Sequence, residues 1–311
     1  MMKGLIFDLE NIPQNDGFVV TQGTFDGVHL GHQHVLRQVV SIAKQHNKPS
    51  LLITFYPHPR LVINPNDDSI KMLSSIEEKA KNILDMGIDY VLVLSFTHEI
   101  SQFSPEKFVQ DILVSKLNVK CMVVGYDHRF GKNRSGGFAE LQEFSKKYHF
   151  DVAEIPASEI DQIAVSSTRI RNAIQSGNLK EANELLGKPY CLTGVVVEGQ
   201  KLGRQLGYPT ANFSIDEPHK LIPQNGVYAG YITIENKPYK TMINIGVRPT
   251  VDGTYRTIEA HILDFNQDIY NQKHTMFLVQ FLREEIRFNG LEALKIQLHK
   301  DELQTRAIQL F

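Results

Sequence analysis

The stretch Gly23-Thr24-Phe25-Asp26-Gly27-Val28-His29-Leu30-Gly31-His32 decides the first half of the fold. The apolar run Phe18–Val20 before it predicts a buried strand, and residues 35–44 after it have apolar side chains at helical spacing. The glycines and histidines therefore belong to a strand-to-helix turn, which is where open α/β sheets bind ligands. A helix that begins there directs unpaired N–H groups and its positive dipole end at the turn, so we expect a bound anion, such as a phosphate.

His29 and His32 are three residues apart, so both imidazoles lie on one side of a first helical turn. Gly31 between them lets the backbone approach a ligand closely. Two imidazoles beside a helix N-terminus suit a reaction in which negative charge builds up on a phosphate. Two other interpretations stay open. One histidine could cap the helix while the other is solvated, or the pair could bind zinc, although no third ligand at metal-like spacing is evident.

Length and composition are those of an ordinary soluble globular protein. The 311 residues suggest about two domains, with 42% hydrophobic and 22% charged residues. The net charge of -2 provides no basic field, so we expect no nucleic-acid partner. Neither a signal peptide nor a membrane-length apolar run is present, so we expect no membrane partner. The two cysteines, Cys121 and Cys191, form no framework, which fits a cytoplasmic protein. The oligomeric state cannot be read from the sequence.

The first half alternates strands and helices. Besides the opening strand, residues 51–55, 90–94, 120–125 and 151–155 are expected strands, and residues 75–84, 105–117 and 138–148 expected helices. Nearly continuous apolar strands separated by helices predict a doubly wound parallel sheet of the α/β class. The linker Gly187-Lys188-Pro189 follows a helix that ends at Leu186, so we expect a first domain over residues 1–186 and a second over 187–311.

Three further stretches of the first half carry polar chemistry at strand ends or helix starts. They are Phe55-Tyr56-Pro57-His58-Pro59, the glycine-rich and cationic stretch Gly125–Gly136, and Val165-Ser166-Ser167-Thr168-Arg169-Ile170-Arg171. The second can wrap a polyanion, or it is an ordinary solvated loop. In the third, Ser167 or Thr168 can cap a helix, which would make a second anion site or an ordinary N-cap with an exposed arginine.

The full string Gly-x-Phe-Asp-Gly-x-His-x-Gly-His resembles the nucleotidylyltransferase superfamily signature. With the three later stretches, it resembles the ordered motifs of bacterial bifunctional riboflavin kinase/FMN adenylyltransferases, whose first domain is Rossmann-like. The resemblance implies that His29 and His32 face the ATP phosphates and that Ser167, Thr168 and Arg171 close over them. It also implies nucleotide and flavin contacts from the motif residues Gly23, Phe25, Asp26, Gly31, Asp127 and Arg129. One departure is His128, where the family more often has phenylalanine.

The second half has short strands with turn signals between them and no long helices. Residues 193–197, 226–234, 240–246, 257–265 and 274–282 are expected strands, and residues 291–308 an expected closing helix. This pattern predicts a small antiparallel β-barrel with one C-terminal helix.

The chemical stretch of this half is Gly203-Arg204-Gln205-Leu206-Gly207-Tyr208-Pro209-Thr210-Ala211-Asn212. It is no Walker A loop, because the Lys-Ser/Thr ending is missing. Thr210 and Asn212 alternate around Ala211 and so point the same way, and their oxygens suit Mg²⁺ carrying phosphates. A base for an attacking hydroxyl could be Glu259 or His261, which share one face of a predicted strand; that face is either solvent or a pocket.

This half resembles the riboflavin kinase module through Gly-Arg-x-x-Gly-x-Pro-Thr-x-Asn and Glu-x-His-Ile-Leu-Asp-Phe. The resemblance implies that Gly203, Gly207, Thr210 and Asn212 bind Mg-ATP, with Thr210 and Asn212 on the metal, and that Glu259 is the general base. Riboflavin, FMN and ATP are then the expected substrates. Two alternatives remain: an adenylyl- or cytidylyltransferase with another acceptor, or a flavin-binding regulatory protein without turnover.

Overall fold

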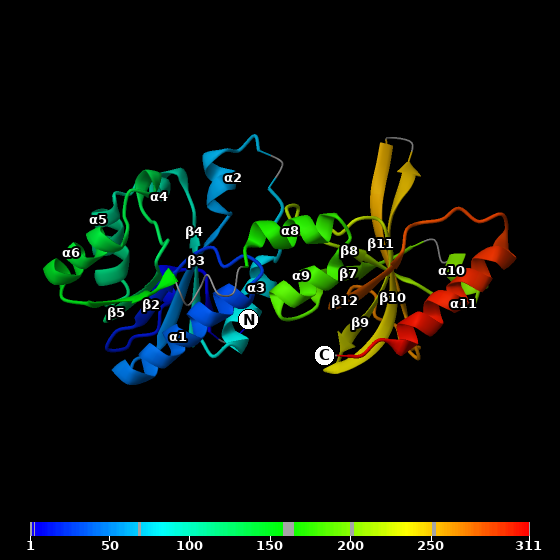
Figure 1. Ribbon diagram of the computed structural model, residues 1–311, viewed down its shortest axis with the longest axis horizontal. Helices are drawn as coiled ribbons and strands as arrows, with labels where there is room; N and C mark the ends of the chain where they lie inside the picture. The colour runs from blue at the N-terminus through cyan, green and yellow to red at the C-terminus, as the bar shows by residue number, and fades with distance from the viewer. Residues whose placement is uncertain are drawn as a thin grey trace. The chain divides into compact units, whose positions relative to one another are not determined.

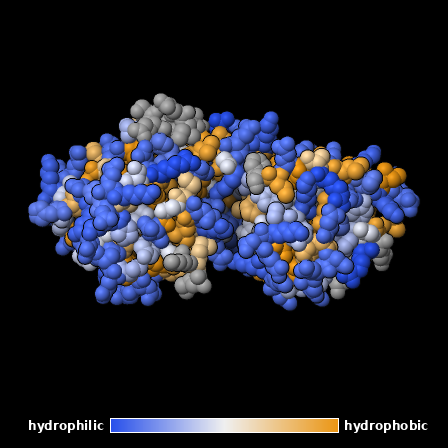
Figure 2. Space-filling view, turned by 90° about the horizontal axis from the view of Figure 1, so that it is seen from below, coloured by the Kyte–Doolittle hydropathy of each residue, from blue (hydrophilic) through white to orange (hydrophobic). Residues whose placement is uncertain are grey.

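The chain folds into two compact units, Met1–Ser166 and Ser167–Phe311, in the computed structural model (Figure 1). The structure describes residues 2, 4–67, 70–157, 165–199, 202–250 and 253–310. No helix among these residues is long and apolar enough to cross a lipid bilayer. On the face seen in Figure 2, hydrophilic residues predominate and hydrophobic ones are scattered.

The first unit is a parallel sheet with helices on both faces. Its strands run in the order β1-β4-β3-β2-β5-β6, with bounds β1 (Leu5–Ile6), β2 (Val19–Gln22), β3 (Ser50–Tyr56), β4 (Tyr90–Ser95), β5 (Cys121–Gly125) and β6 (Asp151–Ile155). Its helical segments are η1 (Leu9–Asn11), α1 (Leu30–His46), α2 (Pro59–Ile63), α3 (Ile76–Asp85), α4 (His98–Ser101), α5 (Pro105–Phe108), η2 (Val109–Val114), η3 (Lys132–Arg134) and α6 (Phe138–Tyr148).

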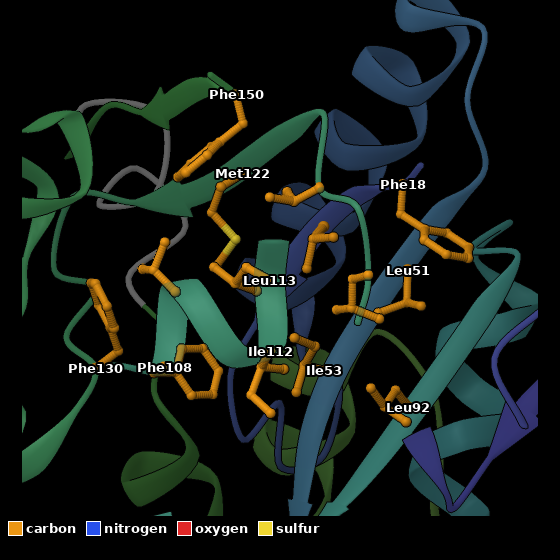
Figure 3. Close-up of a cluster of buried hydrophobic side chains, with 14 of the residues drawn as sticks. Phe18, Leu51, Ile53, Leu92, Phe108, Ile112, Leu113, Met122, Phe130 and Phe150 are labelled. Carbon is orange, nitrogen blue, oxygen red and sulfur yellow. The ribbon is translucent and has the colours of Figure 1, made fainter. Parts of the chain in front are cut away.

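Alternation along the strands explains why both faces are covered. Val20, Leu51 and Ile53 belong to a buried cluster with Phe108 to Leu113 of α5 and η2 (Figure 3). Their neighbours Val19 and Leu52 belong to a second cluster with residues of α1 and α3. Because successive side chains of a strand point to opposite faces, apolar residues at every position require a helical layer on each side. The predicted doubly wound sheet is confirmed.

The order of the strands locates the point where ligands bind. From β2 the chain moves to β3 and β4 on one side, whereas β5 and β6 lie on the other side of β2. The connections therefore diverge between β2 and β5, and the crevice outside the carboxyl ends of such a strand pair is the usual binding place in open α/β sheets. Gly23–His32 follows β2 and Gly125–Gly136 follows β5, so both stretches lie at this switch point.

The second unit is a closed barrel with three helices and one short helical turn. Its strands are β7 (Tyr190–Val197), β8 (Ala211–Ser214), β9 (Gly226–Ile234), β10 (Lys237–Thr250), β11 (Gly253–Ile262) and β12 (Lys273–Arg283), joined in the order β10-β11-β8-β7-β12-β9. Its helical segments are α8 (Ser167–Gln175), α9 (Leu179–Leu186), α10 (Leu202–Gln205) and α11 (Leu291–Ala307). The predicted barrel and closing helix are confirmed.

Three details differ from the sequence-based expectations. β1 has only two residues and carries no periodicity that a pattern could reveal. The helix expected over 105–117 changes to π-helical hydrogen bonding at Val109–Val114. β8 is a four-residue strand that was expected only as an extended segment.

The helices α8 and α9 are packed with the barrel, whereas the sequence suggested that they close the first domain. Asn183 of α9 donates through Nδ2 to the Leu278 carbonyl of β12 at 3.0 Å, and its Oδ1 accepts from the Tyr190 N–H of β7 at 2.8 Å. Gly187 caps α9 in the left-handed region, at φ 68°, so the expected linker is a tight turn. Along the chain, the boundary between the compact units therefore lies between residues 166 and 167. A functional boundary between residues 186 and 187 stays a prediction.

The glycine-rich loop after β5 is anchored in the core. Phe130 and Gly136 exchange two backbone hydrogen bonds of 3.0 Å, and the Phe130 ring is 4% exposed. His128 lies against that ring, with centroids 5.7 Å apart. Burial lowers the pKa of His128 to about 4, with smaller contributions from Asp127, which raises it, and from Arg134 and Arg129. The loop is therefore a fixed structure around a neutral imidazole.

We expect residues 167–311 alone to fold cooperatively, and residues 187–311 to be less stable. The shorter fragment lacks Asn183, so the Tyr190 N–H and the Leu278 carbonyl lose their buried partner, at a cost of about 1–3 kcal/mol each. Urea unfolding followed by circular dichroism measures the difference. Equal stability of the two fragments would contradict the structural role of α9.

His128→Phe should weaken the pH dependence of stability. A histidine whose folded pKa is about 4 binds fewer protons than the unfolded chain between about pH 6.5 and pH 4. The contribution of His128 to the free energy of unfolding is therefore complete above about pH 6.5 and is lost as the pH falls toward 4. At pH 5 the loss amounts to about 2 kcal/mol. Urea midpoints at pH 7.5 and pH 5 should differ less in the variant. The exposed-position variant His98→Gln is the control; an unchanged slope in His128→Phe would contradict the prediction.

Candidate active sites

The turn after β2 is wound through backbone conformations that L-residues rarely adopt. Phe25, Gly27 and Val28 have φ values of 45°, 82° and 47°. A β-branched residue at positive φ is strained, and such strain persists only where the surroundings hold it. Glycine at position 23 permits this backbone path, because a Cβ there would lie only 2.9 Å from the Phe25 ring. The turn is thus a rigid loop against the helix N-terminus.

The side chain of Asp26 holds this loop in place. Its carboxylate is 2% exposed and accepts hydrogen bonds from the backbone N–H groups of Leu73 and Ser74 at 3.0 and 3.1 Å. The Ser74 hydroxyl also accepts from the Gly27 N–H at 3.1 Å. The carboxylate therefore shapes the loop, and the sequence-based expectation that Asp26 itself contacts a nucleotide stays a prediction.

His29 and His32 form a stacked pair at the start of α1. Their ring centroids are 3.6 Å apart with 14° between the planes. His29 is the N-cap, and its Nδ1 accepts from the His32 N–H at 3.3 Å. A Cβ on Gly31 would lie 3.3 Å from the His29 ring, so glycine gives the ring room over the first turn. The capping interpretation is thus confirmed for His29, and the anion-site interpretation stays a prediction.

His32 is held neutral. Burial lowers its pKa well below 6.5, and His29 and the Lys79 ammonium lower it further. A neutral imidazole beside a helix N-terminus donates or accepts a hydrogen bond without bringing a formal charge. No group of three or more His, Cys, Asp or Glu side chains in the described residues could hold a metal ion, so the zinc interpretation gains no support there.

Sequence reasoning missed two polar residues of this site. Lys79 on α3 is 6% exposed and donates to the Thr54 hydroxyl at 3.3 Å, while that hydroxyl lies 3.4 Å from the Thr24 carbonyl of the loop. A lysine inside the apolar stripe of Ile76, Ala80 and Ile83 was the available signal. This places a buried cation beneath the loop.

Gln22 is the second missed residue, at the carboxyl end of β2. Its Oε1 and the Nδ1 of His32 are buried and lack a hydrogen-bond partner within the described part of the chain. A buried polar atom without a partner is costly, so the two atoms suit a polar ligand at the switch point. A glutamine that ends an apolar strand was its only sequence signal.

The other expected residues of the first site are on two segments. Asp127 and Arg129 are exposed in the loop after β5. Ser167 and Thr168 begin α8, with Arg171 in its second turn, as expected. Since α8 is part of the second unit, their approach to the histidine pair stays a prediction.

In the barrel, three predicted residues come together. Asn212 of β8 lies directly opposite Glu259 of β11 in the antiparallel register. The Thr210 hydroxyl donates to Glu259 Oε2 at 3.3 Å. The outward face of β11 therefore carries a cluster of polar side chains at this point, and its role as a site stays a prediction. Hydroxyl, amide and carboxylate oxygens within one cluster fit a hard divalent cation.

Glycines shape the loop before β8. A Cβ on Gly203 would lie 2.3 Å from the Tyr208 carbonyl oxygen, and Gly207 has φ 83°. His261, the other candidate base, has its Nδ1 2.6 Å from the Pro209 carbonyl. That contact uses the imidazole to hold the loop, which leaves Glu259 as the better candidate.

Two family models match the chain, one in each half. The FAD synthetase family model matches residues 11–169, and the riboflavin kinase family model matches residues 186–309. A bifunctional riboflavin kinase/FMN adenylyltransferase of Listeria monocytogenes is 40% identical over 93% of this chain and 91% of its own length. That of Escherichia coli K12 is 37% identical over 97% of this chain and 95% of its own.

A solved structure supports the same architecture. A crystal structure from Streptococcus pneumoniae, described as a macrolide-efflux protein, is 31% identical and superposes with a TM-score of 0.86 over 98% of this chain and 99% of its own. That description belongs to the S. pneumoniae protein, whereas both family models and the curated relatives agree on flavin nucleotides. The chain belongs to the bifunctional riboflavin kinase/FMN adenylyltransferases, which phosphorylate riboflavin to FMN and adenylylate FMN to FAD, both with ATP.

Proposed function

We propose that the Gly23–His32 loop holds the phosphates of ATP while an FMN phosphate oxygen attacks the α-phosphorus and pyrophosphate leaves. His29 and His32 stabilise the charge that grows on the phosphates, and Gly31 lets the backbone N–H groups approach them. The stacked pair at the N-terminus of α1 carries this proposal. Asp26 acts by holding the loop in shape.

The remaining predicted residues contact the flavin and the rest of the nucleotide. Asp127 and Arg129 contact FMN and the nucleotide from the loop after β5. Ser167, Thr168 and Arg171 close over the phosphates during the reaction. Cation and hydroxyl groups at a helix start are suited to this task, because they add donors where the dipole already favours an anion.

Riboflavin phosphorylation takes place, in our proposal, beside β8 and β11. Glu259 accepts the proton of the ribityl 5′-hydroxyl as the hydroxyl oxygen attacks the γ-phosphorus of ATP, the bond to the β-phosphate oxygen breaks and ADP leaves. Thr210 and Asn212 would hold a divalent cation, Mg²⁺ by preference, which would neutralise phosphate charge. The carrying observation is the Thr210–Glu259 hydrogen bond beside the Asn212–Glu259 register pair. Gly203 and Gly207 keep the loop open to the nucleotide.

We also propose a cytoplasmic location, since both reactions consume ATP and the sequence holds only two cysteines, which form no disulfide framework. Burial raises the pKa of the Cys121 thiol to about 11, so this residue stays protonated and unreactive at neutral pH.

Replacing His29 or His32 with alanine should lower FAD formation from FMN by roughly a hundredfold, the usual effect of removing one preorganised donor. FMN formation from riboflavin should stay within about twofold. Since the rings stack, the double variant should lose less than the product of the single losses. Chromatography of flavin products measures both rates. His34→Ala, on the same helix, is the matched control; a loss confined to the kinase step would refute the assignment.

Glu259→Gln should reduce riboflavin phosphorylation by about a hundredfold to ten-thousandfold, because the variant keeps the shape but cannot take the proton. ATP should still bind, and adenylylation of supplied FMN should be unchanged. His261→Ala is the comparison, with a smaller loss through the freed loop. Normal turnover by Glu259→Gln together with a severe loss in His261→Ala would assign the base to His261.

A further inference from the structure

The loop Gly207–Thr210, which leads into β8, is held from two sides. On one side, His261 of β11 contacts the Pro209 carbonyl through Nδ1 at 2.6 Å. The edge of one ring also faces the other between His261 and Tyr208, with centroids 5.2 Å apart and 67° between the planes. Since Thr210 is the next residue after Pro209, the place of its hydroxyl depends on these contacts.

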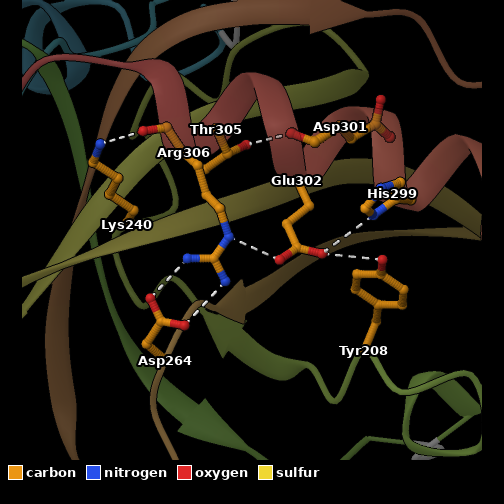
Figure 4. A network of polar contacts seen from close by, with 8 residues as sticks. All are labelled: Tyr208, Lys240, Asp264, His299, Asp301, Glu302, Thr305 and Arg306. Atoms are coloured by element: carbon orange, nitrogen blue, oxygen red, sulfur yellow. Dashed lines mark hydrogen bonds and ion pairs between the residues drawn. The ribbon is translucent and has the colours of Figure 1, made fainter.

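On the other side, α11 reaches the same loop. The Tyr208 hydroxyl donates to Glu302 Oε2 at 3.1 Å, and the Arg306 Nε donates to the other Glu302 oxygen at 2.9 Å (Figure 4). The Arg306 guanidinium also donates to both Asp264 oxygens at 2.8 and 3.0 Å. Asp264 follows β11 in the chain, so the contacts link the loop, the helix and the end of the strand that carries Glu259.

These contacts are suited to positioning more than to stability. The side chains of Arg306 and Asp264 are 43% and 73% exposed, and exposed ion pairs contribute little to folding. The helix has a separate anchor on its buried face, where Arg283 makes a bidentate pair with Asp301, whose side chain is 1% exposed. The anchor and the loop contacts can therefore be changed independently.

We propose that α11 positions the ATP-binding loop of the kinase, with Tyr208, Glu302 and Arg306 as positioning residues. Glu302 fixes the Tyr208 hydroxyl. Arg306 orients Glu302 by a direct hydrogen bond and is itself held by Asp264. The loop then presents the Thr210 oxygen beside Glu259 before ATP arrives, so less conformational entropy is lost on binding. This inference rests on the proposed roles of Thr210 and Glu259.

The test uses the full-length chain and steady-state riboflavin phosphorylation at varied Mg-ATP. Tyr208→Phe and Glu302→Gln should each raise the KM for ATP about threefold to tenfold, with kcat changed less. The double variant should equal the stronger single variant, because both break one contact. Arg306→Lys, which keeps the charge but cannot form both pairs, should have an intermediate effect.

Two readouts separate positioning from general damage. FMN adenylylation and the melting temperature should match the parent in every loop-contact variant. Lys300→Ala, at an exposed position of α11, is the matched control and should keep the parent's KM. Asp301→Asn should instead lower the melting temperature by breaking the buried anchor.

Four outcomes decide the matter. Parent-like KM values in Tyr208→Phe and Glu302→Gln would overturn the inference, and so would fully additive effects in the double variant. Thr210→Ala and Asn212→Ala are measured in the same assay: if they keep full kinase activity, the proposed ATP site itself fails. If they lose activity while Tyr208→Phe does not, only the positioning role of α11 fails.

Discussion

The buried carboxylate of Asp26 is the interaction on which the first unit depends. A charge that is 2% exposed must be compensated, and Asp26 achieves this by accepting backbone N–H groups from Leu73 and Ser74. Those bonds connect the loop after β2 with the segment before α3, and they hold Val28 at a positive φ. The strained turn then sets His29 as the N-cap of α1, so the placement of the stacked imidazoles depends on the buried Asp26 carboxylate.

The two units build phosphate chemistry in different ways. In the parallel sheet, the site follows from the strand order: β2 and β5 diverge, and a helix N-terminus with two imidazoles fills the crevice. In the barrel, the proposed site forms between strands instead. There, an antiparallel register sets Asn212 opposite Glu259, and a loop held by His261 and α11 brings the Thr210 hydroxyl to the same carboxylate.

Burial then tunes the first site. Desolvation, His29 and the Lys79 ammonium all lower the pKa of His32, so its proton is lost well before neutral pH. In the proposed ATP complex, the phosphates meet hydrogen-bond donors, a helix dipole and one buried lysine, while the His32 imidazole contributes a hydrogen-bonding group without charge. His128 is kept neutral at neutral pH by burial beside Phe130 in the neighbouring loop.

The sequence by itself determined the features that repeat locally. These are the apolar strands covered on both faces, the short strands of the barrel, and the motif positions of His29, His32, Thr210 and Asn212. Its pattern alone left Glu259 and His261 open as the base, and it did not reveal the burial of Lys79, the unpartnered Gln22 oxygen within the described residues, or the packing of α8 and α9 with the barrel. Those features depend on residues far apart in the chain, such as Asn183 with Leu278 or Tyr208 with Glu302. Periodicity reports which face of an element is apolar, whereas strand order and register, which arise only when the elements pack, decide what each polar side chain meets.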